Sequence, residues 1–397
     1  MSFYLCTIKK KENTSVNDEN IQLFVSCAPL LEPLLLDELR ELGITSAQMG
    51  YRGVYISEWD WSTIYTINYA SRLANRVLLP IKRFRCYDKR SLYRSVQEID
   101  WSSYLKKDLT FSVDSTVHHR ELRNSLFAAQ VVKDAICDQL RDKKGWRPDV
   151  DLKDPDVHLN LYINQNVALI SFDTSGTPLN KRGYRQETVE APIQETLAAA
   201  LLRLANYKKE NVFLDTCCGS GTLLIEAALI ASNTPPGYLR RNWTFMHHPS
   251  FQQEEWLKVK NNFDAQRIPL EPNHFYGLDN NPQAIRACQS NLKAAGITIA
   301  EIEQIDFRDF IPSVTPDFIM TNPPHGNRLE EVKNLGPFYR SLGDFIKQNC
   351  AKPGRAFIFV GSLELCKEVG LAASRRHVFN NGGIDSRLLE FEIYKKN

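Results

Sequence analysis

Residues 215–222 read Asp-Thr-Cys-Cys-Gly-Ser-Gly-Thr, and this stretch decides the fold of the C-terminal half. An apolar run that ends in an acid, residues 211–215, precedes it and predicts a short strand. Residues 222–231 follow and are apolar almost all round, which is typical of a helix buried against a sheet. Gly219 and Gly221 allow a sharp turn and a close approach of a ligand to the backbone. The stretch therefore predicts a strand, a turn and a helix whose first amides favour a carboxylate; a packing turn without a ligand is the alternative.

The glycine turn lacks the fingerprint of a dinucleotide site. That fingerprint requires a third glycine at the position of Leu224 and an acid about 20 residues further on. The next acid that ends an apolar strand is Asp279, in residues 274–279. Residues 232–273 are therefore predicted to be an insertion, which would either cap the ligand pocket or contact RNA through its arginines and tryptophans.

Two strand-end acids complete a nucleoside-binding pattern. Asp279 is expected to accept hydrogen bonds from ribose hydroxyls, as acids at strand ends do in doubly wound sheets. Asp306 follows the short segment 302–305, and its carboxylate would hold an adenine amine while Phe307 packs on the ring. An ordinary helix cap is the alternative role for Asp306.

The second informative motif is Asn322-Pro323-Pro324-His325, which follows an apolar strand at residues 317–321. The prolines remove backbone donors and fix the direction of the chain, while the Asn322 oxygen remains an acceptor. Acceptors held around an exocyclic amine direct its lone pair at a methyl sulfonium, and such alignment is a large catalytic contribution. His325 would stack on a flipped base; a plain turn and a solvent-facing histidine are the alternatives. Together the two motifs predict an enzyme that binds S-adenosylmethionine and methylates an amine on a planar ring.

The two motifs, in this order, resemble those of the THUMP-domain RNA guanine-N2 methyltransferases that act on 23S ribosomal RNA. The resemblance implies an α/β fold in which a ferredoxin-like unit and a THUMP module precede a class I, Rossmann-like methyltransferase domain. That domain would hold a mostly parallel seven-stranded sheet with an antiparallel last strand and would bind S-adenosylmethionine. Further motifs carry the resemblance at residues 123–125, 147–151, 154–156, 182–185 and 191–197.

The resemblance also implies a domain order along the chain. Some members of the family carry a second methyltransferase domain, and we expect this chain, which ends at Asn397, to lack that activity. The expected segments are a flexible leader at 1–20, a ferredoxin-like subdomain at 21–60, a THUMP RNA-binding domain at 61–175, a linker at 176–190 and the methyltransferase domain at 191–397.

By the same resemblance, two groups of residues form the active site. His325 stands where the family usually has tyrosine. The methyl-transfer site is expected to consist of Asn322, Pro323, Pro324 and His325. The cofactor is expected to contact Asp215, Cys217, Gly219, Ser220, Gly221, Thr222, Asp279, Asn280, Asp306, Phe307, Asn322, Pro192 and Thr196.

One basic and aromatic segment, residues 82–94, is the candidate RNA surface. Phe84, Tyr87 and Tyr93 are interleaved with its basic residues, and Asp88 is its one acid. Such a mixture suits contact with phosphates and stacking on bases, although a solvated helix face and strand end would show it too. The basic residues are Lys82, Arg83, Arg85, Lys89, Arg90 and Arg94.

Composition bounds the remaining possibilities. The net charge of +2 does not by itself indicate nucleic acid, and the absence of an 18-residue apolar run predicts no membrane span. Nine cysteines without a Cys-x-x-Cys pair predict no metal site and a reducing, cytoplasmic location. The expected partner is large-subunit ribosomal RNA, naked or in an early assembly intermediate, and nothing specifies an oligomeric state. An adenine-N6 methyltransferase on RNA or DNA and a catalytically silent RNA-binding protein are the competing hypotheses.

Overall fold

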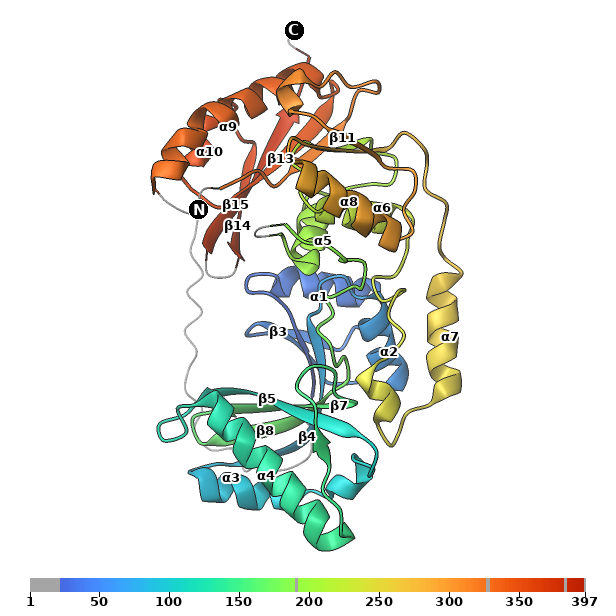
Figure 1. The fold of residues 1–397 in the computed structure, drawn as a ribbon, viewed down its shortest axis with the longest axis vertical. Coiled ribbons are helices and arrows are strands. Elements are labelled where there is room, and N and C mark those ends of the chain that lie inside the picture. The colour runs from blue at the N-terminus through green and yellow to red at the C-terminus, as the bar shows by residue number, and fades with distance from the viewer. Residues whose placement is uncertain (1–21, 190–191, 326–328, 382–383, 396–397) are drawn as a thin grey trace.

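The computed structural model describes residues 22–189, 192–325, 329–381 and 384–395. Two sheets organise this part of the chain, an eight-stranded sheet in the N-terminal half and a seven-stranded sheet in the C-terminal half. Figure 1 shows the two halves one above the other along the long axis of the molecule. The predicted leader, residues 1–20, lies outside the described residues. Within the described chain, no helix combines the length and the apolar character needed to cross a membrane.

The N-terminal half begins with the alternation of strands and helices that defines a ferredoxin-like unit. Its strands follow the order β2-β3-β1-β4 and are antiparallel to their neighbours. Asp60 starts the second helix because its side chain accepts a hydrogen bond from the Thr63 amide at 2.7 Å. The predicted boundary between residues 60 and 61 falls inside this unit. The elements are β1 (Leu23–Ser26), α1 (Glu32–Glu41), β2 (Ala47–Gly50), β3 (Gly53–Ile56), α2 (Trp61–Ala70) and β4 (Arg76–Arg85).

The THUMP-like unit continues the same sheet, because β4 also pairs with β8. The complete strand order is β2-β3-β1-β4-β8-β7-β5-β6. Figure 1 shows α3 and α4 on the side of this sheet that is farther from the C-terminal half. The elements are α3 (Lys89–Gln97), β5 (Thr110–His118), α4 (Ser125–Lys144), β6 (Asp149–Val150), β7 (Val157–Asn164) and β8 (Val167–Asp173).

The C-terminal half confirms the predicted class I sheet. Its order is β11-β10-β9-β12-β13-β15-β14, with β11 through β13 parallel and β15 antiparallel to both of its neighbours. The predicted helix at residues 222–231 is α6, with the same bounds. The elements are α5 (Glu195–Leu204), β9 (Phe213–Asp215), α6 (Thr222–Ala231), α7 (Gln253–Asp264), β10 (Phe275–Asp279), α8 (Pro282–Ala294), β11 (Glu301–Gln304), β12 (Phe318–Thr321), α9 (Leu329–Asn349), β13 (Gly354–Val360), α10 (Leu365–Glu368), β14 (Arg375–Asn381) and β15 (Ile384–Ile393).

The predicted insertion, residues 232–273, packs against the ferredoxin-like unit. Trp256 of α7 is buried, and its ring centroid lies 5.8 Å from that of Tyr65 and 5.4 Å from that of Tyr69 on α2. Arg240 donates hydrogen bonds to backbone carbonyls of the segment between the two halves. The insertion therefore braces the N-terminal half, while its two predicted roles, a pocket cap or an RNA contact, stay predictions.

A buried cluster of charges joins the two halves. Glu226 of α6 is fully buried, lies 3.5 Å from Arg182 and accepts a hydrogen bond from the Tyr184 hydroxyl at 3.0 Å. Arg182 also donates to the carbonyl of Arg72 in the ferredoxin-like unit. Arg72 in turn donates to the carbonyl of Leu229 on α6. Within the predicted linker, the described residues 176–189 therefore form a packed segment, of which Arg182 and Tyr184 enter the core.

We expect Glu226→Ala to lower the free energy of unfolding by about 3–5 kcal/mol, because it leaves buried guanidinium charge without its carboxylate. Urea denaturation followed by circular dichroism measures the effect. Glu41→Ala is the matched control, since Glu41 forms an exposed ion pair with Arg203 between the same two halves at 2.6 Å. That change is expected to lower stability by less than about 1 kcal/mol. Equal midpoints for the two variants would contradict the structural role of Glu226.

Candidate active site

The glycine turn has the geometry that its residues require. Gly219 and Gly221 lie between β9 and α6 and have positive φ angles of 54° and 82°. Residues that carry a Cβ rarely adopt such angles. A Cβ on Gly221 would also lie 2.6 Å from the Cys288 sulfur. Gly221 occupies the position just before the first turn of α6, so the amides of that turn face the loop.

Two carboxylates hold this turn at the carboxyl ends of neighbouring parallel strands. Asp215, at the end of β9, accepts a hydrogen bond from the Cys217 amide at 3.1 Å. Asp279, at the end of β10, accepts from the Gly219 amide at 3.0 Å and from the Asn281 amide at 2.9 Å. The structure thus brings the predicted glycine turn and the predicted ribose-binding acid into direct contact.

The environment of Asp215 opposes its ionisation. The side chain is 1% exposed, and burial, with a smaller contribution from the nearby Asp279 charge, raises its pKa to about 7. Burial and the Asp215 charge also raise the pKa of the Cys217 thiol, which keeps that thiol protonated. A buried carboxylate of this kind suits a positively charged ligand, which would favour its ionised form.

Two polar residues to which the sequence analysis gave no role in the site tie the segment before α5 to the glycine turn. Arg185 donates to the hydroxyls of Ser220 and Thr222 at 3.1 and 3.0 Å. Asn291 of α8 is fully buried, donates to the Ser220 carbonyl at 2.9 Å and accepts from the Gln186 amide at 2.7 Å. The polar groups of Ser220 and Thr222, which were predicted to bind cofactor, are therefore used at least in part to hold the turn.

The predicted adenine-binding pair differs from its expected arrangement. Asp306 caps a short 3-10 turn, and both of its oxygens bond to the Arg308 guanidinium, at 2.8 and 2.5 Å. The ring of Phe307 is 2% exposed and packs edge-on against Phe338 and Phe345 of α9. Phe307 is thus buried against α9 in this structure, and the cap predicted as the alternative for Asp306 is present; the adenine contacts of both residues stay predictions.

Three other predicted cofactor residues are Thr196, Pro192 and Asn280, and their contacts with the cofactor stay predictions. Thr196 is fully buried, and its hydroxyl donates to the Asn75 side chain of the ferredoxin-like unit at 3.3 Å. The structure therefore places its hydroxyl at the boundary between the halves. Pro192 and Asn280 are exposed.

Asn322 presents an acceptor that the described chain does not satisfy. It follows β12, the strand beside β9, so it lies at the same edge of the sheet as the glycine turn. Its Oδ1 atom is buried and has no hydrogen-bond partner among the described residues. A buried unpaired acceptor is unfavourable unless a ligand supplies the donor. An amine would supply one.

The rest of this loop is held by α9 and by the end of β13. The Tyr339 hydroxyl donates to the Pro324 carbonyl at 3.1 Å, while Pro323 is buried. The Gly361 amide donates to Nδ1 of His325 at 3.2 Å, and burial lowers the pKa of that imidazole to about 4. His325 is therefore neutral near pH 7 and held in place; its stacking on a flipped base stays a prediction.

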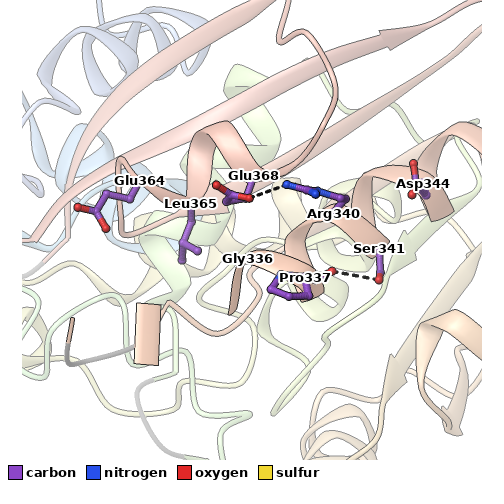
Figure 2. A pocket seen from close by; sticks show the side chains of 8 residues that line it. All are labelled: Gly336, Pro337, Arg340, Ser341, Asp344, Glu364, Leu365 and Glu368. Carbon is purple, nitrogen blue, oxygen red and sulfur yellow. Dashed lines mark hydrogen bonds and ion pairs between the residues drawn. The ribbon is translucent and has the colours of Figure 1, made fainter. Parts of the chain in front are cut away.

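A pocket of about 540 Å³ lies between α9 and α10, and Figure 2 shows its lining side chains. Arg340 and Glu368 form an ion pair there at 3.0 Å. Asp344 and Glu364 add further negative charge to the lining. None of the predicted site residues lines this pocket, and its acidic lining does not favour a nucleic acid.

The predicted RNA segment, residues 82–94, does not form one surface. Lys82 is ion-paired at 2.7 Å, and Phe84 is buried in the core. Arg83 and Arg85 are exposed on β4 and alternate with Phe84, so they occupy the face of the sheet opposite to the helices. The remaining basic residues are exposed on the helical side: Lys89, Arg90 and Arg94 of α3.

In the C-terminal sheet, the antiparallel strand β15 lies between β13 and the edge strand β14. This strand order is the class I arrangement. Its carboxyl edge offers glycine-turn amides, strand-end carboxylates and an unpaired amide oxygen, all suited to a nucleoside cofactor and an amine acceptor. Fold and site together define a class I methyltransferase that uses S-adenosylmethionine.

Comparison with family models agrees with this class. The model described as the RMKL-like methyltransferase domain matches residues 182–390. The THUMP domain model matches residues 86–173, and the RlmL ferredoxin-like domain model matches residues 22–78. The chain belongs to the RMKL-like methyltransferase family.

Two relatives show how this chain compares in length. It is 36% identical over 372 residues to a Synechocystis sp. protein provisionally named RNA methyltransferase slr0064. That alignment covers 94% of this chain and 96% of the relative. It is also 36% identical over 393 residues to the ribosomal RNA large subunit methyltransferase K/L of Syntrophotalea carbinolica, over 95% of this chain and 54% of that protein. The chain thus spans about half the length of the K/L relatives it matches.

Two solved structures share the fold over nearly the whole chain. SMU.472, described as a methyltransferase by inference and solved in complex with S-adenosylhomocysteine, has a TM-score of 0.82 and 26% identity, over 95% of this chain and 99% of that chain. A Listeria monocytogenes protein described as a predicted N6-adenine-specific DNA methylase has a TM-score of 0.80 and 26% identity, over 94% of this chain and 97% of that chain.

Proposed function

We propose that this protein transfers a methyl group from S-adenosylmethionine to the exocyclic N2 amine of a guanine in 23S ribosomal RNA. The observation that carries the proposal is the buried, unpaired Oδ1 of Asn322 beside the glycine turn. The cofactor, when bound, supplies a methyl group on a positively charged sulfur. Asn322 would accept one hydrogen of the amine and so direct the nitrogen lone pair. No strong base is needed at this site, because the amine can lose its proton after the transfer.

The RNA substrate is supported by the N-terminal half and by the relatives. A THUMP domain precedes the methyltransferase domain, and exposed arginines lie on its sheet. The K/L relative is named for the large ribosomal subunit. Guanine N2 rests on the resemblance of the two motifs to the guanine-N2 methyltransferases.

An adenine-N6 methyltransferase is the second candidate. The solved Listeria structure of the same fold is described as acting on adenine N6 of DNA. Both amines are exocyclic groups on planar rings, so an Asn-Pro-Pro loop suits either one. A catalytically silent RNA-binding protein is a third hypothesis, against which the unpaired acceptor at Asn322 speaks.

The substrate is proposed to be naked RNA or an early assembly intermediate in the cytoplasm. The target base must leave its stack to reach a recessed loop, which costs a few kcal/mol. Ribosomal proteins that rigidify the surrounding helix would raise that cost.

The test incubates the purified protein with methyl-labelled cofactor and one of four substrates: deproteinised 23S RNA, intact 50S subunits, 16S RNA or DNA. Nucleosides are then separated and identified by mass spectrometry. We expect label in N2-methylguanosine, from naked 23S RNA more than from intact subunits. Label in N6-methyladenosine, or label only in DNA or 16S RNA, would overturn the proposal.

A further inference from the structure

The β5, β7 and β8 part of the eight-stranded sheet, with the adjoining end of β4, has a covered face and an open face. On the covered face, residues such as Leu161 are buried with the apolar residues of α4. The alternate positions lie on the other face. There Tyr162 is 37% exposed, and Arg83, Arg85 and His118 are exposed as well.

The strand register gathers these side chains. Arg83 pairs with Leu169, which pairs with Tyr162, so one row of residues crosses three strands. Arg85 lies in the next row of the same face, and the ring of His118 meets that of Tyr162 at a centroid distance of 6.4 Å. Adjacent strands are about 4.8 Å apart, so these rings and guanidiniums lie within the span of a few nucleotides.

Tyr55 of β3 extends this face. It is 38% exposed, and its ring packs on Phe24 at a centroid distance of 4.8 Å. Burial and then the neighbouring Tyr162 hydroxyl raise the pKa of Tyr55, while the Arg83 guanidinium lowers it. Phe24 pairs with both Tyr55 and Leu78, and Leu78 pairs with Asp173, so the strand register places Tyr55 on the face of the sheet that carries Asp173. We use the name open sheet face for the set Tyr55, Arg83, Arg85, His118 and Tyr162.

The charge of this face is positive. The two acids on the same side of β5 and β8 are Asp114 and Asp173, and both are ion-paired with Arg76. Arg76, Arg83 and Arg85 together outnumber these two carboxylates by one, so the face keeps a net positive charge. The face also lies on the side of the sheet nearer the methyltransferase half, because α3 and α4 cover the far side (Figure 1).

We propose that the open sheet face binds a single-stranded segment of the RNA substrate, with bases stacked on Tyr55 and Tyr162 and phosphates beside Arg83 and Arg85. This inference rests on RNA being the substrate, as proposed above. It replaces the single surface predicted at residues 82–94, since α3 lies across the sheet from these aromatic rings.

The chemistry favours unpaired RNA over a duplex. Aromatic rings on a sheet stack on bases whose faces are free, whereas an A-form duplex hides those faces and offers mainly phosphates and 2′-hydroxyls. The helical side is the competing surface: Lys89, Arg90 and Arg94 are exposed there, and the exposed rings of Tyr87 and Phe127 lie at the starts of α3 and α4. The Tyr87 and α3 variants below separate it from the open sheet face.

The test measures binding of the full chain to a fluorescein-labelled, unstructured oligoribonucleotide of about 12 nucleotides by fluorescence anisotropy. Combined Tyr55→Ala and Tyr162→Ala changes are expected to raise Kd about tenfold or more, because stacking on one aromatic residue is worth a factor of about five upward. Tyr55→Phe with Tyr162→Phe should keep Kd within about twofold. Tyr87→Ala is the matched control, because Tyr87 is 58% exposed but lies outside the open sheet face.

A second pair of variants tests the phosphate contacts. Arg83→Ala with Arg85→Ala should reduce the slope of log K against log salt by about 1.4, whereas Lys89→Ala with Arg90→Ala should leave it unchanged. The inference is overturned if the α3 pair changes the slope and the β4 pair does not, if Tyr87→Ala weakens binding as much as the tyrosine pair, or if a blunt RNA duplex binds as tightly as the single strand. Affinity for S-adenosylmethionine and transfer to 23S RNA are measured in parallel, so a failure of the proposed function is seen separately.

Discussion

Asn322→Ala is expected to lower the turnover number for methyl transfer by about 10²–10³-fold at saturating cofactor. The change removes the buried acceptor that would orient the target amine, and the loss of one preorganised polar group at a reacting centre has effects of this size. The interaction matters most in the transition state, because only there must the lone pair point along the line of transfer. Affinity for S-adenosylmethionine should change by less than about threefold.

Methylation of naked 23S RNA at saturating cofactor measures the rate of methyl transfer, and calorimetry measures the affinity for S-adenosylmethionine. Asn281→Ala is the matched control, since it removes the same side chain from a loop at the same sheet edge. The Asn281 side chain accepts a hydrogen bond from the Gln283 amide and caps α8, so its loss should lower stability slightly and leave turnover within about threefold. A loss of cofactor affinity equal to the loss of turnover would place Asn322 in the cofactor site alone.

The local chemistry of the glycine turn made that part of the fold predictable. Residues 211–231 carry their own strand, turn and helix signals, and α6 has the predicted bounds. The contact of the turn with Asp279 follows from the parallel order of β9 and β10, whose carboxyl ends must meet at one edge. The position of Asn322 follows from the same rule applied to β12.

The parts that sequence patterns did not predict depend on residues far apart in the chain. The Asn291 side chain accepts hydrogen bonds from the amides of Gln186 and Glu187, which lie more than a hundred positions earlier. The sequence around these residues gives no local signal for the contact. The edge-on packing of Phe307 against Phe338 and Phe345 likewise depends on a later helix and has no local signal.

The basic segment at residues 82–94 divides between two faces of the sheet for a local reason. Asp88 accepts a hydrogen bond from the Ser91 amide at 2.7 Å and starts α3, so the chain passes there from a strand to a helix. Residues on either side of such a junction follow different periods and face different directions. The Asp88-x-x-Ser91 spacing is a capping signal that could have separated the two groups of basic residues.

Cofactor affinity is expected to rise with pH through about 7, because Asp215 must ionise to meet a positively charged ligand. Burial raises the pKa of this carboxyl to about 7 in the free protein, so below that pH the group is mostly protonated. A bound sulfonium would favour the ionised form, and binding near neutral pH should then release a proton. We expect the Kd for S-adenosylmethionine to be several-fold higher at pH 6 than at pH 8.

The raised pKa of Asp215 has the opposite effect on the free energy of unfolding, which should fall as the pH rises. In the unfolded chain this carboxyl ionises near pH 4, whereas in the folded protein it stays protonated up to about 7, so the native state binds more protons between these values. Its contribution to stability therefore falls as pH rises through this window, by up to roughly 4 kcal/mol. Ligand-free Asp215→Asn should accordingly melt at a higher temperature than the unchanged protein at pH 8, and the difference should disappear near pH 4.

Asp215→Asn should thus gain stability and lose function. Calorimetry at pH 6, 7 and 8 is expected to show affinity for S-adenosylmethionine at pH 8 weakened by about tenfold or more, since contacts with a charged partner are worth about 1.5–3 kcal/mol. The pH dependence attributable to this carboxyl should vanish. Asp344→Asn is the matched control, because Asp344 is exposed on α9 and forms an ion pair with the nearby Lys347. If Asp215→Asn binds the cofactor as tightly as the unchanged protein at pH 8, the buried carboxylate serves the fold and does not meet the cofactor's charge.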